Sequence, residues 1–214
     1  MNQTIITFLA VCVFVSVTLA EGGKIERTKF YSQALEKNML GDSPSRELLV
    51  YLPPSYDTKE AKRYPVIYLL HGNSPGLAGK INPAYTWARD RDAKDGRTAR
   101  RGVKTIMDDL VKKGHAKEMI VVMPNGRNKY RGSHYVNSPV TGNWADHIAK
   151  DLVAFIDKKY RTLNSRNSRA LAGYSMGGRG AFILGMKYPD VFGVIYAMSG
   201  GAMNFGKVRK LPRM

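Results

Sequence analysis

The feature that most constrains the fold is a pentapeptide at residues 173–177, Gly-Tyr-Ser-Met-Gly, which has the pattern G-x-S-x-G. It follows a short apolar run at residues 170–172 and opens a glycine-rich stretch with a helical pattern. A serine between a strand and a helix at this spacing lies in a sharp turn. Gly173 and Gly177 are needed because a Cβ there would collide across the turn. The sequence therefore predicts a strand–turn–helix unit with Ser175 at the turn.

Short apolar runs alternate with helical patterns along the rest of the chain. The runs are apolar throughout, which is typical of strands in a parallel sheet that is covered on both faces. The sequence therefore predicts an α/β fold. Strands are expected at residues 47–52, 66–70, 119–123, 170–172 and 194–198, and helices at residues 103–113, at 146–160 and from the pentapeptide to 188.

Two backbone N–H groups are expected near the Ser175 hydroxyl. One belongs to Met176, because the free N–H groups of a helix N-terminus can donate to an oxyanion that develops on a reacting carbonyl. The other is expected in the loop after the strand at 66–70. There Gly72 permits close approach of the backbone, and the N–H of Asn73 or a neighbour can donate. The alternative for the whole unit is a glycine-rich β-to-α turn with an N-capping serine.

Three aromatic residues outside the pentapeptide enter the prediction of the site. His71 ends the strand before Gly72, and it is interpreted as a buried, hydrogen-bonded structural histidine. Where a serine at such a strand–helix turn acts as a nucleophile, its histidine base follows it in chain order, whereas His71 precedes Ser175. Trp87 and Trp144 are expected to be partly buried beside the site, as packing residues or pocket walls.

The chain is strongly basic, with 34 Lys and Arg against 17 Asp and Glu, a formal charge of +17. Such a balance can indicate a nucleic acid or another polyanion as partner. The basic residues are scattered, however, and no aromatic residues alternate with them as in a stacking platform for bases. We therefore expect no nucleic-acid function, but a basic surface that favours anionic polymers or cell walls.

The first twenty residues differ in kind from the rest of the 214-residue chain. Residues 5–17 carry no charge, and small residues at Thr18 and Ala20 fit a cleavage site after Ala20. This pattern predicts a signal peptide at residues 1–20, a single domain at residues 21–214, and a secreted or periplasmic protein without a stable membrane anchor. An uncleaved N-terminal anchor is the alternative.

The composition argues against disulfides and metal. Cleavage after residue 20 would remove Cys12, the only cysteine, which excludes a cysteine nucleophile. The four histidines stand far apart in the sequence, and no Cys/His cluster has zinc spacing. No structural metal is therefore expected.

Five segments in order resemble the putative-esterase family of α/β-hydrolases, which includes esterase D, feruloyl esterases, enterochelin esterases and mycolyltransferases. They lie at residues 50–56, 64–72, 133–138, 151–157 and 172–178. The resemblance implies an α/β-hydrolase fold, a mostly parallel sheet with helices on both faces. It implies Ser175 as nucleophile, the Met176 backbone as one oxyanion donor and the loop after His71, with Gly72 and Asn73, as the other. It implies no metal or organic cofactor.

The chain departs from this family in one respect. The triad order of the fold is Ser, then Asp or Glu, then His, but all four histidines precede Ser175 and Asp190 is the only acidic residue after it. The resemblance also fades after Gly201. The expectation is therefore a domain incomplete at its C-terminus, with the triad Asp and His absent. The activity of the 214-residue chain itself stays open.

Three functions compete on this evidence. The first is a secreted serine carboxylesterase that acts through an acyl-enzyme on a small-molecule or polysaccharide-linked ester, with feruloyl or acetyl esters of plant polysaccharide as the substrates that the family implies. The second is a non-catalytic α/β-hydrolase-like binding protein or an inactive truncated fragment. The third is a basic polyanion-binding protein. Hydrolysis is not distinguished from acyl transfer, and the oligomeric state is not predicted.

Overall fold

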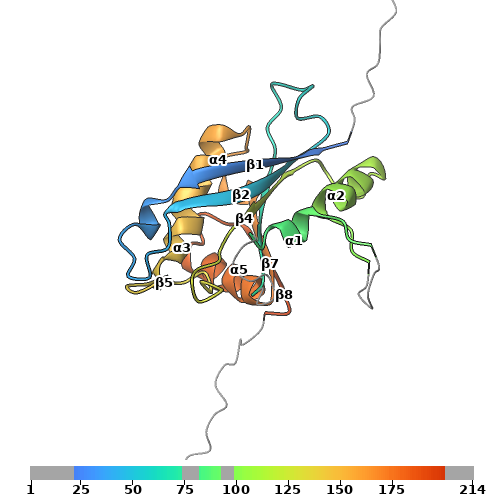
Figure 1. Cartoon of the computed structure of the whole chain (residues 1–214). Coiled ribbons are helices and arrows are strands. Elements are labelled where there is room, and N and C mark those ends of the chain that lie inside the picture. Colours follow the sequence, from blue (N-terminus) through green and yellow to red (C-terminus); the bar gives the residue numbers. More distant parts are fainter. Residues whose placement is uncertain (1–21, 74–81, 93–98, 201–214) are drawn as a thin grey trace, which may run out of the picture.

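The computed structural model describes residues 22–73, 82–92 and 99–200 (Figure 1). The predicted signal peptide at residues 1–20 and the chain after residue 200 lie outside the described residues. Six strands form one sheet in the order β1-β2-β4-β3-β7-β8. Their bounds are Lys24–Tyr31 for β1, Ser45–Leu52 for β2, Val66–Leu70 for β3, Ile120–Pro124 for β4, Arg169–Tyr174 for β7 and Val194–Met198 for β8.

The sheet is mostly parallel, as predicted. β4 pairs with β3, β3 with β7 and β7 with β8, all in parallel, whereas β2 is antiparallel to β1 and β4. The carboxyl ends of the parallel strands therefore meet at one edge of the sheet. In the register of β3 with β7, Leu70 lies opposite Gly173. The loop that begins at His71 and the turn at Ser175 are consequently neighbours.

Helices cover both faces of the sheet (Figure 1). The helices α1 and α2 pack on one face, where the core contains Leu49, Tyr51, Val103, Met107 and Val121. The run α3-η2-α4 and helix α5 pack on the other, where it contains Val50, Val122, Ile148, Leu152 and Leu184. The bounds are Tyr85–Ala88 for α1, Val103–Lys112 for α2, Trp144–Asp146 for α3, His147–Leu152 for the π-helical η2, Val153–Lys159 for α4 and Met176–Lys187 for α5.

The remaining elements are short. A two-stranded hairpin precedes α3, and two 3₁₀ turns follow β1 and precede β7. They are β5 at Asn137–Ser138, β6 at Gly142–Asn143, η1 at Gln33–Leu35 and η3 at Arg166–Ser168.

Within the six-stranded sheet, the strand that the sequence did not predict is β1. Its sequence, KIERTKFY, is rich in charges, and only Phe30 is buried. It is an edge strand that pairs along its whole length with β2, from Lys24 opposite Leu52 to Tyr31 opposite Ser45. An edge strand with exposed side chains needs no continuous apolar run, so the charged sequence of β1 gives no strand signal. The opposite edge, β8, is apolar but exposes Val194, Ile195 and Tyr196.

Candidate active site

Ser175 lies between the end of β7 and the start of α5, in the strand–turn–helix unit that the pentapeptide predicts. Its backbone has φ 55° and ψ −117°, a conformation that side-chain-bearing residues rarely adopt. Such strain persists only where the surrounding structure enforces it, and it is concentrated at functional sites. Met176 is the first residue of α5, so its N–H has no partner within the helix.

Three glycines make this turn possible by letting backbone approach backbone. A Cβ added to Gly173 would collide with the backbone of Gly177, and one added to Gly177 would collide with the carbonyl groups of Leu70 and His71. A Cβ added to Gly72 would lie 3.2 Å from Ser175 Cβ. The loop after β3 is thus in direct contact with the serine turn, which is the placement that the predicted oxyanion donors at Gly72 and Asn73 require.

His71 has the structural role that the sequence indicates. Its side chain is 1% exposed. Nδ1 lies 2.7 Å from the carbonyl oxygen of Gly72, and Nε2 lies 2.9 Å from the backbone nitrogen of Gly126. Because a carbonyl only accepts and an N–H only donates, Nδ1 carries the proton and Nε2 accepts. Both ring nitrogens are therefore occupied, and His71 is not available as a base for Ser175.

The protonation state of His71 follows from its surroundings. Burial, which penalises the charged ring, lowers its pKa to about 4, and the positive charges of Arg46 and Arg127 add to this effect, although the hydrogen bond to Gly72 opposes it. The neutral ring holds the Gly72 carbonyl in place. It thereby fixes the backbone that leads to Asn73.

Tyr135 supports the same loop, which the sequence analysis did not foresee. Its hydroxyl donates to the His71 carbonyl oxygen at 3.0 Å. Its ring is fully buried and lies so close to Gly126 and Gly180 that a Cβ on either would collide with it. The only signal in the sequence was its place in the segment at residues 133–138. Tyr135 thus joins the loop after β3, the turn after β4 and helix α5.

The other histidines lie elsewhere. His147 is buried in the core, His115 follows α2, and His134, at φ 53°, has Nδ1 3.5 Å from a guanidinium nitrogen of Arg179. In the described part of the chain, no hydrogen bond joins the Ser175 side chain to a histidine. The structure therefore brings together the serine and the predicted oxyanion backbone, and none of the described hydrogen bonds joins this serine to a histidine base.

A cavity of about 220 Å³ adjoins the serine turn. Its wall contains Gly72 and Asn73 from the loop after β3 and Tyr174 from the turn itself, together with Thr86, Trp87 and Arg100. Trp87 is partly buried and lines this cavity, as predicted.

The prediction for Trp144 is right about packing but wrong about its place and its partial burial. Its side chain is fully buried, its Nε1 donates to the Thr141 carbonyl oxygen at 2.7 Å, and the guanidinium of Arg46 lies over its ring. It does not line the cavity beside Ser175. The apolar packing of α3 decides its place, which no local pattern in the sequence encodes.

Within residues 22–73, 82–92 and 99–200, no group of three or more His, Cys, Asp or Glu side chains is arranged to hold a metal ion. None of the helices in these ranges is long and apolar enough to cross a membrane.

Comparison with known proteins identifies the lineage. Residues 43–205 match the family described as "Putative esterase", which is more than half of the chain. The chain belongs to this esterase family. Its sheet and its serine turn are those of the α/β-hydrolase fold, which solved esterases share.

Two relatives of this esterase-family chain are longer proteins. It is 28% identical over 182 residues to the endo-1,4-beta-xylanase/feruloyl esterase of Xylanibacter ruminicola, a stretch that covers 84% of this chain and 22% of that protein. It is 31% identical over 154 residues to an esterase of Mycobacterium tuberculosis, covering 72% and 28% of the two chains.

Solved structures give the same picture. A ferulic acid esterase is 32% identical with a TM-score of 0.62, and the match covers 83% of this chain and 58% of that one. A ferulic acid esterase of the anaerobic fungus Anaeromyces mucronatus, solved in complex with ferulic acid, is 25% identical with a TM-score of 0.57 and the same coverage. This chain thus spans less than two thirds of the length of each of these relatives.

Proposed function

We propose that this esterase-family protein is a secreted serine carboxylesterase that cleaves feruloyl or acetyl esters attached to polysaccharide. The observation that carries the proposal is the strained backbone of Ser175, held at φ 55° at the start of α5 and in contact with Gly72. A structural N-capping serine needs no such strain, because N-cap residues ordinarily have extended backbone angles.

In the proposed reaction, the Ser175 oxygen attacks the ester carbonyl and forms a tetrahedral intermediate while the hydroxyl proton passes to a general base, which later returns it to the departing alcohol. None of the described residues is hydrogen-bonded to Ser175 in that role. The oxyanion of the intermediate accepts hydrogen bonds from the backbone N–H groups of Met176 and Asn73. Collapse of the intermediate releases the alcohol and leaves an acyl group on Ser175, which water then removes. His71 contributes by positioning, since its neutral ring holds the Gly72 carbonyl and so orients the N–H of Asn73.

The lining of the cavity beside Ser175 favours a substrate ester whose acyl group is aromatic. Trp87 and Tyr174 supply apolar ring surface, while Asn73, Thr86 and Arg100 supply hydrogen-bonding groups. Such a mixture of aromatic walls and a few polar groups suits a planar phenolic acid better than a bare acetyl group. The feruloyl esterase of Xylanibacter ruminicola and the ferulic acid complex point to the same acyl class.

Covalent labelling tests the nucleophile without requiring turnover. The protein is incubated with a fluorophosphonate, and the adduct is located by peptide mass spectrometry. We expect one phosphonyl group on Ser175, none in Ser175→Ala, and unchanged labelling in Ser165→Ala, which alters an exposed serine. Absence of an adduct on Ser175 would favour the non-catalytic binding protein instead.

Two further measurements address acyl specificity and export. Acylation of Ser175 by 4-nitrophenyl ferulate, followed by intact-mass spectrometry, should be faster than acylation by 4-nitrophenyl acetate, and Trp87→Ala should remove the preference. Equal rates in the unaltered protein would contradict the aromatic acyl site.

Secretion predicts that the exported protein begins at Glu21, and N-terminal sequencing that finds Met1 in the exported fraction would contradict cleavage.

A further inference from the structure

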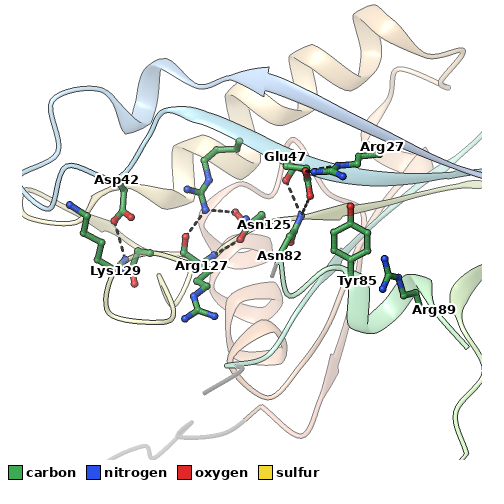
Figure 2. A pocket seen from close by; sticks show the side chains of 11 residues that line it. Arg27, Asp42, Glu47, Asn82, Tyr85, Arg89, Asn125, Arg127 and Lys129 are labelled. Atoms are coloured by element: carbon green, nitrogen blue, oxygen red, sulfur yellow. Dashed lines mark hydrogen bonds and ion pairs between the residues drawn. The ribbon is translucent and has the colours of Figure 1, made fainter. Parts of the chain in front are cut away.

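A second cavity, of about 670 Å³, lies beside β2 and the segment that follows β4, and Figure 2 shows the side chains that line it. Because β4 and β7 are parallel to β3, this segment and Ser175 both follow carboxyl ends of strands at the same edge of the sheet. We call this cavity the basic groove. Five cationic side chains line it against two acidic ones, Asp42 and Glu47, an excess of three positive charges. The cations are Arg27, Arg46, Arg89, Arg127 and Lys129.

Most of this positive charge has no acidic partner in the groove. Arg27 is paired with Glu47, whose other oxygen accepts from Asn82 at 3.2 Å. Asp42 accepts the backbone N–H of Lys129 at 3.3 Å. Among the described residues, no ion pair joins a carboxylate to Arg46, Arg89, Arg127 or Lys129. The groove therefore has a net positive electrostatic potential, which attracts anions.

Two guanidinium nitrogens in the lining are buried without a hydrogen-bond partner. They are Nε of Arg46 and Nη1 of Arg127. The Arg46 side chain is held in place because it donates to the carbonyl oxygens of Asn125 and Arg127 and lies 4.9 Å from the Trp144 ring. A buried N–H without an acceptor costs free energy, and both guanidinium groups belong to side chains that line the groove. Their positive charge, which no carboxylate neutralises, favours a ligand that carries a carboxylate or a similar oxyanion.

The groove and the serine turn share two structural elements. Asn125 and Arg127 flank Gly126, whose N–H donates to His71. Helix α1 directs Tyr85 to the groove and Trp87 to the cavity beside Ser175. One extended ligand can thus place an ester at Ser175 and another of its groups in the groove.

The lining selects among anionic ligands. Its cations are spread over β1, β2, α1 and the segment after β4, and amides, the Tyr85 ring and two carboxylates lie between them. A free phosphate ion is far smaller than this groove, and the carboxylates would repel a densely charged nucleic acid. The amides and the Tyr85 hydroxyl suit the hydroxyl groups of a sugar, while a guanidinium fork suits a single carboxylate.

We propose that the basic groove is a binding subsite for a carboxylate-bearing sugar, a uronic acid unit of an acidic polysaccharide. The link between this sugar and the ester at Ser175 rests on the proposed function. Binding itself does not.

Calorimetry with trigalacturonate tests the subsite, and its methyl ester, the same sugar without charge, is the matched ligand. We expect the acid to bind at least tenfold more tightly than the ester. The double variant Arg89→Gln/Lys129→Gln should weaken binding of the acid at least tenfold. Lys117→Gln/Lys187→Gln, which removes the same charge from exposed positions outside the groove, should change it less than twofold.

Several outcomes would overturn the assignment. Equal affinity for the ester would show that the carboxylate is not recognised. Displacement by an equal concentration of inorganic phosphate would assign the groove to small anions, and displacement by an oligonucleotide would assign it to nucleic acid. Equal effects of the two double variants would show general charge attraction only. Fluorophosphonate labelling of Ser175 is measured in parallel, so trigalacturonate binding without labelling would retain the subsite and reject the proposed hydrolysis.

Discussion

The turn around His71 and the core around His147 each enclose a histidine that solvent hardly reaches, with exposed fractions of 1% and 0%. Both ring nitrogens of His71 have hydrogen-bond partners, whereas neither nitrogen of His147 has one in the described structure. The His147 ring instead stacks on the Phe30 ring, with 5.2 Å between the ring centroids, and meets the Trp144 ring edge-on, with 5.4 Å between the centroids.

The difference shows that burial alone does not give a histidine its role. His71 joins three segments that are distant in sequence and holds the loop beside Ser175, so its shape and its polarity both matter. His147, the first residue of η2, fills space in the protein core as an aromatic ring. Burial of its two unpaired ring nitrogens costs free energy. Four predictions follow from this contrast, from the largest effect to the smallest.

Gly177→Ala should have the largest effect, because the added Cβ meets the carbonyl groups of Leu70 and His71. The turn around His71 has no room to move, so we expect a loss of about 4 kcal/mol in the free energy of unfolding and no phosphonate labelling of Ser175. Urea denaturation measures the loss. Gly114→Ala is the control, since Gly114 has φ 71° but open space around it and should cost about 1 kcal/mol. Equal losses in the free energy of unfolding for Gly177→Ala and Gly114→Ala would show that the close contact of Gly177 with Leu70 and His71 does not restrict the turn.

His71→Leu should destabilise the protein by about 3 kcal/mol, because it leaves the Gly126 N–H and the Gly72 carbonyl buried without partners. Labelling of Ser175 should slow at least tenfold as the loop loses its anchor. His147→Leu, of similar volume change, should alter the free energy of unfolding at pH 7.5 by less than about 1 kcal/mol. Urea denaturation measures the free energy of unfolding of both variants. Equal losses would contradict the difference in role between His71 and His147.

Acidification should weaken both regions through their neutral histidines. Burial lowers the pKa of His71 to about 4 and that of His147 to about 3. The unfolded chain takes up these protons below about pH 6.5 and the folded chain does not, so stability is lost as the pH falls from about 6.5 towards 4, at about 1.4 kcal/mol per pH unit for each histidine.

His147→Leu removes one of the two groups. Between pH 7.5 and 4.5 the variant should therefore lose about 3 kcal/mol less stability than the unaltered protein. Urea denaturation at both pH values measures this difference. Parallel losses in the two proteins would mean that His147 does not stay neutral in the folded core.

Tyr135→Phe should have the smallest effect. It removes the hydrogen bond to the His71 carbonyl but keeps the buried ring, so we expect a loss of about 1 kcal/mol and a labelling rate within about threefold of the original. Tyr130→Phe, at an exposed tyrosine, should change neither. A loss as large as that of His71→Leu would show that Tyr135, and not the histidine, is the main anchor of the loop.

Sequence reasoning was reliable where local sterics or local polarity decide. The pattern at residues 173–177 can form its turn only with glycines at the crowded positions, and strands β2, β3, β4, β7 and β8 contain apolar runs long enough to be recognised. Strand β1 was missed because an edge strand with charged side chains obtains its order from pairing with β2, not from its own pattern.

The candidate site was predicted in part for the same reason. Ser175, Met176, Gly72 and Asn73 could be named because each belongs to a turn next to an apolar strand. Tyr135 could not, since its contact with His71 spans 64 residues of sequence. Trp144 was misplaced because its position depends on how α3 packs against the core.

The sequence by itself determined the alternation of strands and helices and the serine turn, since these depend on neighbours within a few residues. Only the tertiary structure decided that His71 has both nitrogens occupied and His147 neither, and that residues of β1, β2, α1 and the segment after β4 together form the basic groove. The physical reason is that a hydrogen bond or a field of charge depends on distance in space. Chain folding brings Gly126 to His71 across 55 residues, and no local pattern records that approach.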